Sequence, residues 1–133
     1  MALALNARAE ELIESLALER HPEGGWYRQV FKSSRIVQRD SEIRSAVTAI
    51  YFLLAGGEQS AWHRVQSDEI WIHLEGGTVM LHIDDDTRRL SAHDERLVVV
   101  PANVWQSAEI EGDYALVTCV VGPGFEFEDF TLQ

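Results

Sequence analysis

The chain has 133 residues, of which 46% are hydrophobic and 25% are charged. That length and balance are typical of one globular domain, so we expect a single core over residues 1–133 and no disordered segment. The 22 acidic residues outnumber the 11 basic ones and give a formal net charge of −11, which repels phosphate backbones and anionic lipid surfaces. Nucleic acids and membranes are therefore not expected as partners.

The cysteine content and the N-terminal stretch indicate the compartment. Cys119 is the one cysteine of the chain, so no disulfide can form within it and nothing points to an oxidising compartment. The first twenty residues are too acidic, and their apolar run is too short, for a signal peptide, and no segment reaches about 18 continuous apolar residues. We expect a cytoplasmic protein.

The N-terminal pattern predicts an amphipathic helix over about residues 6–19. Apolar residues recur there at helical spacing, and Asn6 is a suitable N-cap. The stretch "RHPEGG", residues 20–25, then ends the helix, because Pro22 opposes its continuation and the two glycines let the backbone turn.

The rest of the chain reads as short strands separated by Gly, Asp, Asn or Pro. Such density of strands, with no helices between them, predicts an all-β protein, an antiparallel sandwich or closed barrel. The aspartate cluster within residues 82–90 predicts a solvated hairpin turn, and residues 122–130 predict a half-buried edge strand. The eight main strand candidates cover residues 26–31, 45–54, 60–65, 68–74, 78–83, 96–100, 104–110 and 114–121.

The candidate chemistry centres on residues 57–77, which contain His63, Glu69 and His73. Strand side chains alternate between faces, so Glu69, Trp71 and His73 project to the same side. If the hairpin formed with the preceding strand closes into a barrel, His63 and Glu69 converge in its interior. Three interpretations stay open: a metal site, an acid–base pair without metal, or a polar stripe on an ordinary strand.

A second group of candidates follows the helix. Trp26, Tyr27 and Arg28 offer a stacking surface, a phenol and a guanidinium at a barrel mouth. Packing of Trp26 beneath the helix is an equally good interpretation. An inward-facing Arg28 needs an anion, which Glu69 or a ligand phosphate would supply.

The motif spacing resembles that of the cupin superfamily. Gly57, His63, Glu69 and Gly76 follow its first motif, and "PANVWQ", residues 101–106, follows its second, in which Asn103 can take the left-handed backbone conformation. More narrowly, "HPEGGWYRQVFKSSR", "HRVQSDEIW" and "DYALVTCVVGPGFEFEDF" resemble a family of small single-domain, RmlC-like cupins, the fifth cupin group, formerly a domain of unknown function. The resemblance implies a double-stranded β-helix, a jelly-roll barrel over about residues 26–132 with a short N-terminal helix.

The resemblance also bears on metals. Metal-binding cupins use two histidines one residue apart, a glutamate, and a histidine in the second motif. The corresponding residues here are His63, Val65, Glu69 and Gln106, so half of the usual ligands are missing. We therefore expect no cofactor; a divalent metal, if bound, would use His63, Glu69 and Gln106. His73 lies about 13 Å along the strand from Glu69, too far to share the ion.

The resemblance implies a pocket for a small polar molecule. Our first hypothesis is a metal-independent isomerase, epimerase or dehydratase of a carbohydrate or nucleotide-sugar-like compound. His63 would be the general base, Tyr27 or Glu69 would return or relay a proton, and Arg28 would hold an anionic group. Further ligand contacts are expected from Trp26, Trp71, His73 and Gln106.

Two alternatives remain at this point. One is a non-catalytic module that senses or stores a ligand, and the other is a metal-dependent oxygenase or isomerase. Whether the chain is an enzyme is thus left open by the sequence. Relatives of this kind pair through their sheets, so we also expect a homodimer.

Overall fold

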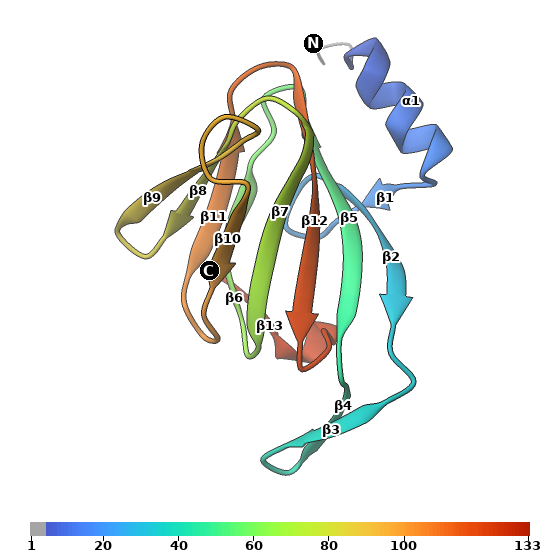
Figure 1. Cartoon of the computed structure of the whole chain (residues 1–133), viewed down its shortest axis with the longest axis vertical. Helices are drawn as coiled ribbons and strands as arrows, with labels where there is room; N and C mark the ends of the chain where they lie inside the picture. The colour runs from blue at the N-terminus through green and yellow to red at the C-terminus, as the bar shows by residue number, and fades with distance from the viewer. Residues whose placement is uncertain (1–4) are drawn as a thin grey trace.

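A computed structural model describes residues 5–133, and its helix α1 spans Ala7–Ser15 (Figure 1). The Asn6 side chain accepts hydrogen bonds from the backbone N–H groups of Arg8 and Ala9, as expected of an N-cap. The helix ends four residues earlier than predicted because Ala17 takes a left-handed conformation, with φ of 52°, ahead of strand β1. Its buried Leu12 packs against the outer face of the larger sheet, in a cluster that includes Leu53.

Two antiparallel sheets form the barrel, which confirms the expected cupin architecture. The larger sheet has the strand order β1-β2-β5-β12-β7-β10, the smaller one has β13-β6-β11-β8-β9, and β3 and β4 form a separate hairpin. The strands are β1 (Glu19–Arg20), β2 (Trp26–Lys32), β3 (Ile36–Arg39), β4 (Glu42–Ser45), β5 (Thr48–Ala55), β6 (Ser60–Val65), β7 (Asp68–Gly76), β8 (Val79–Ile83), β9 (Asp86–Leu90), β10 (Leu97–Val100), β11 (Gln106–Ile110), β12 (Tyr114–Gly122) and β13 (Phe130–Leu132).

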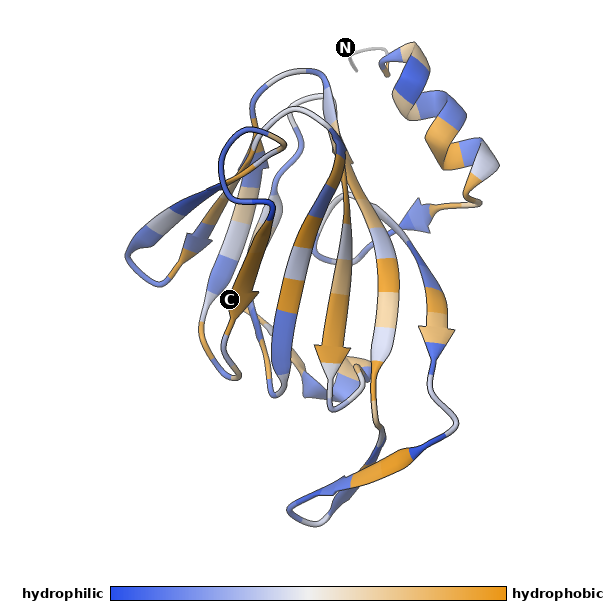
Figure 2. Cartoon of the chain, in the orientation of Figure 1, coloured by the Kyte–Doolittle hydropathy of each residue, from blue (hydrophilic) through white to orange (hydrophobic). Residues whose placement is uncertain are grey.

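The main core lies between the two sheets. Phe52, Trp71, Leu81, Leu90 and Val98 are each no more than 1% exposed and belong to one cluster. They come from five different strands, because each strand turns alternate side chains inward. Figure 2 shows the apolar runs along β5 and β12, two central strands of the larger sheet, and along β10 at its edge.

One predicted pairing is wrong. We expected β6 and β7 to form a hairpin, but β6 pairs with β11 and β13, whereas β7 pairs with β12 and β10. The chain crosses from the smaller sheet to the larger one between them. His63 and Glu69 therefore enter the interior from two different sheets.

Other boundaries also differ from the prediction. The β3–β4 hairpin, which projects away from the barrel in Figure 1, was not predicted, and β5 starts only at Thr48 because residues 42–45 belong to that hairpin. The expected edge strand over residues 122–130 is instead a 3₁₀ turn, Phe127–Asp129, followed by β13. The hairpin expected within residues 82–90 is present as β8 and β9. No helix within residues 5–133 is long and apolar enough to cross a membrane.

Candidate functional site

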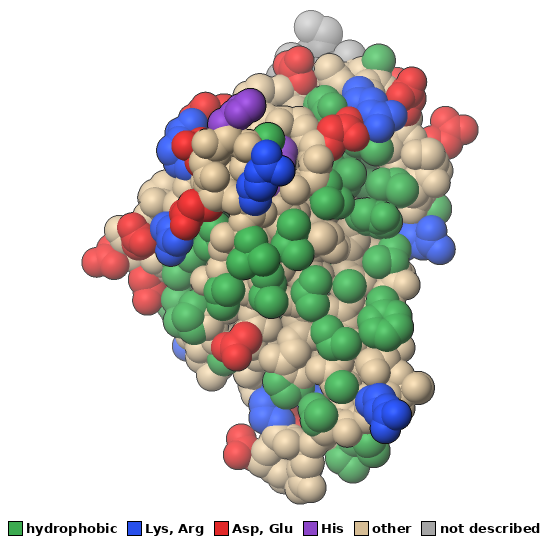
Figure 3. Space-filling view, in the orientation of Figure 1, with side chains coloured by type: hydrophobic (Ala, Val, Ile, Leu, Met, Phe, Trp, Pro, Cys, Tyr) green, Lys and Arg blue, Asp and Glu red, His purple; other side chains and the backbone are tan. Residues whose placement is uncertain are grey.

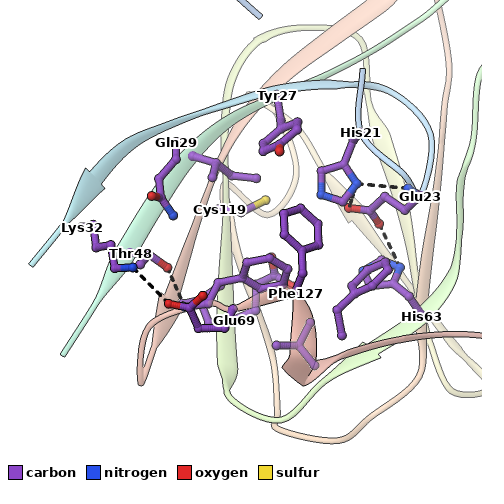
Figure 4. Close-up of a pocket in the computed structure, with 16 residues that line it drawn as sticks. His21, Glu23, Tyr27, Gln29, Lys32, Thr48, His63, Glu69, Cys119 and Phe127 are labelled. Carbon is purple, nitrogen blue, oxygen red and sulfur yellow. Dashed lines mark hydrogen bonds and ion pairs between the residues drawn. The ribbon is translucent and has the colours of Figure 1, made fainter. Parts of the chain in front are cut away.

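A cavity of about 210 Å³ lies inside the barrel (Figure 4). Its wall is made by β2, β5, β6, β7, β12, the loop before β2 and the C-terminal segment. Three of the predicted residues line it, namely Tyr27, His63 and Glu69. The further polar lining consists of His21, Glu23, Gln29, Lys32, Thr48, Cys119 and Glu126, and the aromatic lining consists of Phe125, Phe127 and Phe130.

The loop over residues 21–25 holds Glu23 against β6. The backbone N–H of Ala61 donates to the carbonyl oxygen of Glu23 at 2.8 Å, and the N–H of Gly24 donates to that of His21 at 3.0 Å. Gly24 has a φ of 106°, and a Cβ there would overlap the backbone oxygen of Gln59. Only glycine lets the loop approach β6 this closely.

Glu23 and His63 form a buried pair. Nδ1 of His63 lies 2.9 Å from Oε2 of Glu23 and 2.7 Å from the carbonyl oxygen of Ala61. Both neighbours are acceptors, so Nδ1 carries a proton, and the lone pair of the neutral ring is on Nε2. The Ser60 hydroxyl also donates to Glu23. The side chains of His63 and Glu23 are 3% and 8% exposed, so water does not compete for these bonds.

The pair shifts both pKa values. Burial alone would lower the pKa of His63, but the hydrogen bond to Glu23 and its charge outweigh burial and raise that pKa above 6.5. Burial likewise works to raise the pKa of Glu23, but the bond to His63 and the charge of that ring bring it below 4.5. Imidazolium and carboxylate thus stabilise each other.

His21 lies on the other side of Glu23 (Figure 4). The backbone N–H of Glu23 donates to Nδ1 of His21 at 3.1 Å, while Oε1 of Glu23 is 3.4 Å from the same nitrogen. The shorter, properly directed N–H bond requires an unprotonated Nδ1, so the longer contact is not an ion pair. Burial lowers the pKa of His21, in agreement with a neutral ring.

Glu69 is connected to Gln106 and Trp71 beneath the cavity. The Trp71 indole N–H donates to Oε1 of Gln106 at 3.0 Å, and Nε2 of Gln106 donates to Oε1 of Glu69 at 2.8 Å. Burial raises the pKa of the Glu69 carboxyl. Burial and the nearby Glu69 also raise the pKa of the Cys119 thiol, so the floor of the cavity favours neutral groups.

This arrangement does not fit a divalent metal. An indole N–H can only donate, so it fixes the Gln106 oxygen toward Trp71 and leaves the amide N–H₂, which is no ligand, toward Glu69. His63 can offer an ion only Nε2, because its Nδ1 is occupied by Glu23 and Ala61, and Nδ1 of His21 accepts from the backbone N–H of Glu23. Within residues 5–133, no three His, Cys, Asp or Glu side chains are grouped so that they could hold an ion.

Several residues predicted to contact a ligand lie outside the cavity. On β2 the side chains of Tyr27 and Gln29 line it, so strand alternation turns Trp26 and Arg28 outward. Trp26 packs with the α1 cluster, under Arg20, whose guanidinium lies 4.8 Å from the ring centroid. Arg28 is exposed, and its Nη1 reaches the carbonyl oxygen of Leu16 at 3.4 Å, not Glu69 or an interior anion.

The remaining three predicted contacts are also displaced from the cavity wall. His73 is half-buried, and its Nε2 lies 2.9 Å from the carbonyl oxygen of Gly77. Trp71 belongs to the main core, and Gln106 lies behind Glu69. These two support the site without lining it.

Sequence reasoning missed His21, Glu23 and the aromatic wall. The stretch "HPEGG" was interpreted as the end of a helix and as part of the family resemblance, but not as a site, although it places two titratable side chains in a glycine-rich turn. The segment of Phe127 and Phe130 is anchored by Asp129, which is 1% exposed and accepts from Arg44 at 2.8 and 2.9 Å. Phe130 in turn packs on His63, with ring centroids 5.3 Å apart.

Comparison with known proteins identifies the family. Residues 10–133 match the sequence model of a protein family described as "Cupin superfamily (DUF985)". A hypothetical protein from Leishmania major is 30% identical, with a TM-score of 0.89 over 94% of this chain and 86% of that one. A protein from Shewanella oneidensis is 34% identical, with a TM-score of 0.83 over 94% of this chain and 84% of that one. No protein with a curated description matches.

More distant structures share the fold. An RmlC-like cupin from Shewanella frigidimarina is 15% identical, with a TM-score of 0.61 over 82% of this chain and 85% of that one. The family match covers the barrel and most of the helix, and the two-sheet topology agrees with it. The chain therefore belongs to the DUF985 family of the cupin superfamily.

Proposed function

We propose that this cupin is a metal-independent isomerase or epimerase of a small carbohydrate-like carbonyl compound, with His63 as its general base. The observation that carries the proposal is the bond between Nδ1 of His63 and the buried Glu23. This bond fixes the Nδ1 edge of the His63 ring. The basic Nε2 has no hydrogen-bond partner among residues 5–133, and the side chain lines the cavity. A base held this way is suited to remove a proton from a bound substrate.

The proposed reaction transfers one proton out and one back. Nε2 of His63 takes the proton from a carbon next to the carbonyl, and the C–H electrons form an enolate. Tyr27 comes from the opposite sheet, and burial raises the pKa of its phenol, so it remains protonated. A proton returned by Tyr27 to the other face of the same carbon gives the epimer, and Glu69, whose carboxyl pKa is raised by burial, is the second proposed donor.

The size of the cavity limits the substrate. A volume of about 210 Å³ equals the space of about seven water molecules in the liquid. That is enough for the reacting ring or chain of a monosaccharide, whereas a nucleotide would have to remain outside. Phe125, Phe127 and Phe130 provide an apolar wall for the C–H face of such a molecule.

The experiment is deuterium incorporation. The protein is incubated in D₂O with a panel of small hydroxy aldehydes and ketones, and NMR follows the loss of the C–H signal beside the carbonyl. We expect catalysed exchange with at least one compound, and exchange at the uncatalysed rate for His63→Asn. His82→Asn, outside the cavity, is the matched control and should exchange like the wild type. Equal exchange by His63→Asn and the wild type would refute the mechanism.

Binding without reaction is the second proposed function, and the aromatic wall is the observation that favours it. Phe127 and Phe130 lie against His21 and His63 and offer recognition surface that the chemistry does not need. A compound that binds tightly, is recovered unaltered and gains no deuterium would favour this function over catalysis.

We also propose that a second copy of the chain covers the outer face of the larger sheet. One row across β10, β7, β12, β5 and β2 is entirely apolar, and Figure 3 shows the hydrophobic side chains gathered there. The row consists of Val99, Ile70, Val120, Ala49 and Phe31, of which Val99 and Phe31 are 48% and 53% exposed. Two chains of charge −11 repel each other, so a contact free of charged side chains suits a second copy.

Light scattering tests this pairing. We expect about twice the 15.0 kDa of one chain for the wild type and one chain for Val120→Lys. Ala92→Lys, on an exposed loop, is the control for added charge and should remain paired. A wild-type mass of one chain would contradict the proposal.

A further inference from the structure

His21 is a buried imidazole that the proton transfer described above does not use. Its side chain is 4% exposed and lines the same cavity as His63. Figure 4 shows the two rings on either side of Glu23, each turning one nitrogen toward that residue. Glu23 contacts them through different groups, its backbone N–H for His21 and its carboxylate for His63.

These two contacts give the rings opposite polarity. The N–H of Glu23 requires a lone pair on Nδ1 of His21, so the ring proton of His21 is on Nε2. The carboxylate requires a proton on Nδ1 of His63, so the lone pair of the neutral ring is on Nε2. Glu23 thereby leaves His21 with an Nε2–H that can donate a hydrogen bond and leaves His63 with an Nε2 that can accept a proton.

Both Nε2 atoms are accessible from the cavity. Neither has a hydrogen-bond partner among residues 5–133. Trp26 Nε1 is the one side-chain nitrogen or oxygen in that part of the chain that is sealed from solvent without a partner. The two Nε2 atoms are therefore not enclosed in the core, and they face the cavity that His21 and His63 line.

We propose that His21 is a catalytic residue that donates its Nε2–H to the carbonyl oxygen of the substrate. The inference rests on the proposed function and assigns the other half of the reaction. As His63 removes the proton from the neighbouring carbon, negative charge collects on the carbonyl oxygen, and the hydrogen bond from His21 stabilises it. His21 keeps its proton throughout, so the proton that His63 takes is the only one removed from the substrate in this step.

A neutral ring suits this role. The titratable groups around His21 are Glu23, His63 and Tyr27, and the Tyr27 ring centroid lies 4.6 Å from that of His21. The His21 ring also packs against Phe52, Phe127 and Phe130. Once His63 has taken the proton from the substrate, a neutral His21 beside it avoids two adjacent positive charges. The substrate class follows from the same geometry: an aldehyde or ketone that carries a C–H bond on the adjacent carbon, not a glycoside with a closed acetal.

The first test needs no substrate. Two-dimensional ¹⁵N–¹H NMR of the imidazole rings reports which nitrogen is protonated. We expect His21 to be neutral at pH 7, with Nε2 protonated and Nδ1 bare. A proton on Nδ1 of His21, or an imidazolium at pH 7, overturns the inference whatever the protein catalyses.

The second test compares two replacements of His21 with dihydroxyacetone, ¹³C-labelled at its carbonyl, as the probe. His21→Gln places an amide N–H near Nε2, whereas His21→Leu has a similar volume and no donor. We expect at least a 100-fold loss of deuterium exchange, mainly in kcat, for His21→Leu and less than a tenfold loss for His21→Gln. His82→Gln is the matched control.

The carbonyl signal separates this inference from the proposed function. Binding should move the probe's carbonyl resonance downfield in the wild type and in His21→Gln, but not in His21→Leu. If the shift is present while the wild type fails to exchange deuterium, the donor role of His21 stands and the isomerase proposal fails. Equal exchange or an equal carbonyl shift in the two His21 variants, or no binding of the probe at 100-fold excess, overturns the inference.

Discussion

The loop that carries Glu23 should depend on Gly24, and Gly24→Ala is the perturbation that shows it. A non-glycine residue with positive φ costs about 1–2 kcal/mol, and overlap with backbone that cannot move costs about 1–3 kcal/mol more. Gly24 has both features, with a φ of 106° and the backbone oxygen of Gln59 in the space of the new methyl group. Gly57, with a φ of 79° and no atom within 4 Å, has only the first.

The assay is urea unfolding followed by tryptophan fluorescence, with Gly57→Ala as the control. We expect Gly57→Ala to lose about 1–2 kcal/mol of unfolding free energy and Gly24→Ala to lose about 1–3 kcal/mol more. Gly24→Ala should also slow deuterium exchange, since the loop must move and take Glu23 away from His63. Equal losses in the two variants, within about 0.5 kcal/mol, would refute this account of the loop.

The remaining predictions concern the contacts of Asp129 with Arg44 and Arg39, the outward-facing Arg28, and the Glu23–His63 pair. Asp129→Asn should cost about 1.5–3 kcal/mol in urea unfolding because it removes the buried carboxylate that pairs with Arg44 and Arg39 and leaves Glu42 as the partner they share, whereas the neighbouring exposed Glu128→Gln should change stability by less than about 0.5 kcal/mol. Arg28→Ala should leave deuterium exchange and stability unchanged, since its side chain points away from the cavity; a loss of exchange would contradict that position. The pH dependence of the pair follows from the two shifts. His63 has a raised pKa, so its contribution to the free energy of unfolding is complete below pH 6.5 and is lost as the pH rises through its folded pKa. Glu23 has a lowered pKa, so its contribution is complete above pH 4.5 and is lost as the pH falls through its folded pKa. The stability difference between the wild type and Glu23→Gln should therefore be largest between about pH 4.5 and 6.5, and a difference independent of pH in urea titrations would contradict the ion pair.

Local sequence patterns were sufficient for much of the fold. Alternation along β7 correctly separates Glu69 and Trp71 from Ile70 and Ile72, because the side-chain period of a strand is fixed. Asn103 has a φ of 66°, as the turn in the second cupin motif requires. These features depend on neighbours in sequence, which the sequence displays.

The rest depends on contacts between distant segments. The partners of β6 and β7 lie at least 25 residues away along the chain, so the hairpin expected between them had no local signal against it. Glu23 meets His63 because its loop packs on β6, forty residues later. Gln106 was predicted as a ligand, but the direction of its amide is set by the Trp71 indole, which no spacing rule contains.

The central claim is that Glu23 holds His63 as the base of the site, and an NMR titration of the His63 ring in the wild type and in Glu23→Gln tests it most directly. In the wild type the ring should titrate above the ordinary value of 6.5, because Glu23 outweighs burial. In Glu23→Gln the raising effect of the carboxylate is gone and burial remains, so the ring should titrate below that value. Superimposable curves for the two proteins would contradict the claim.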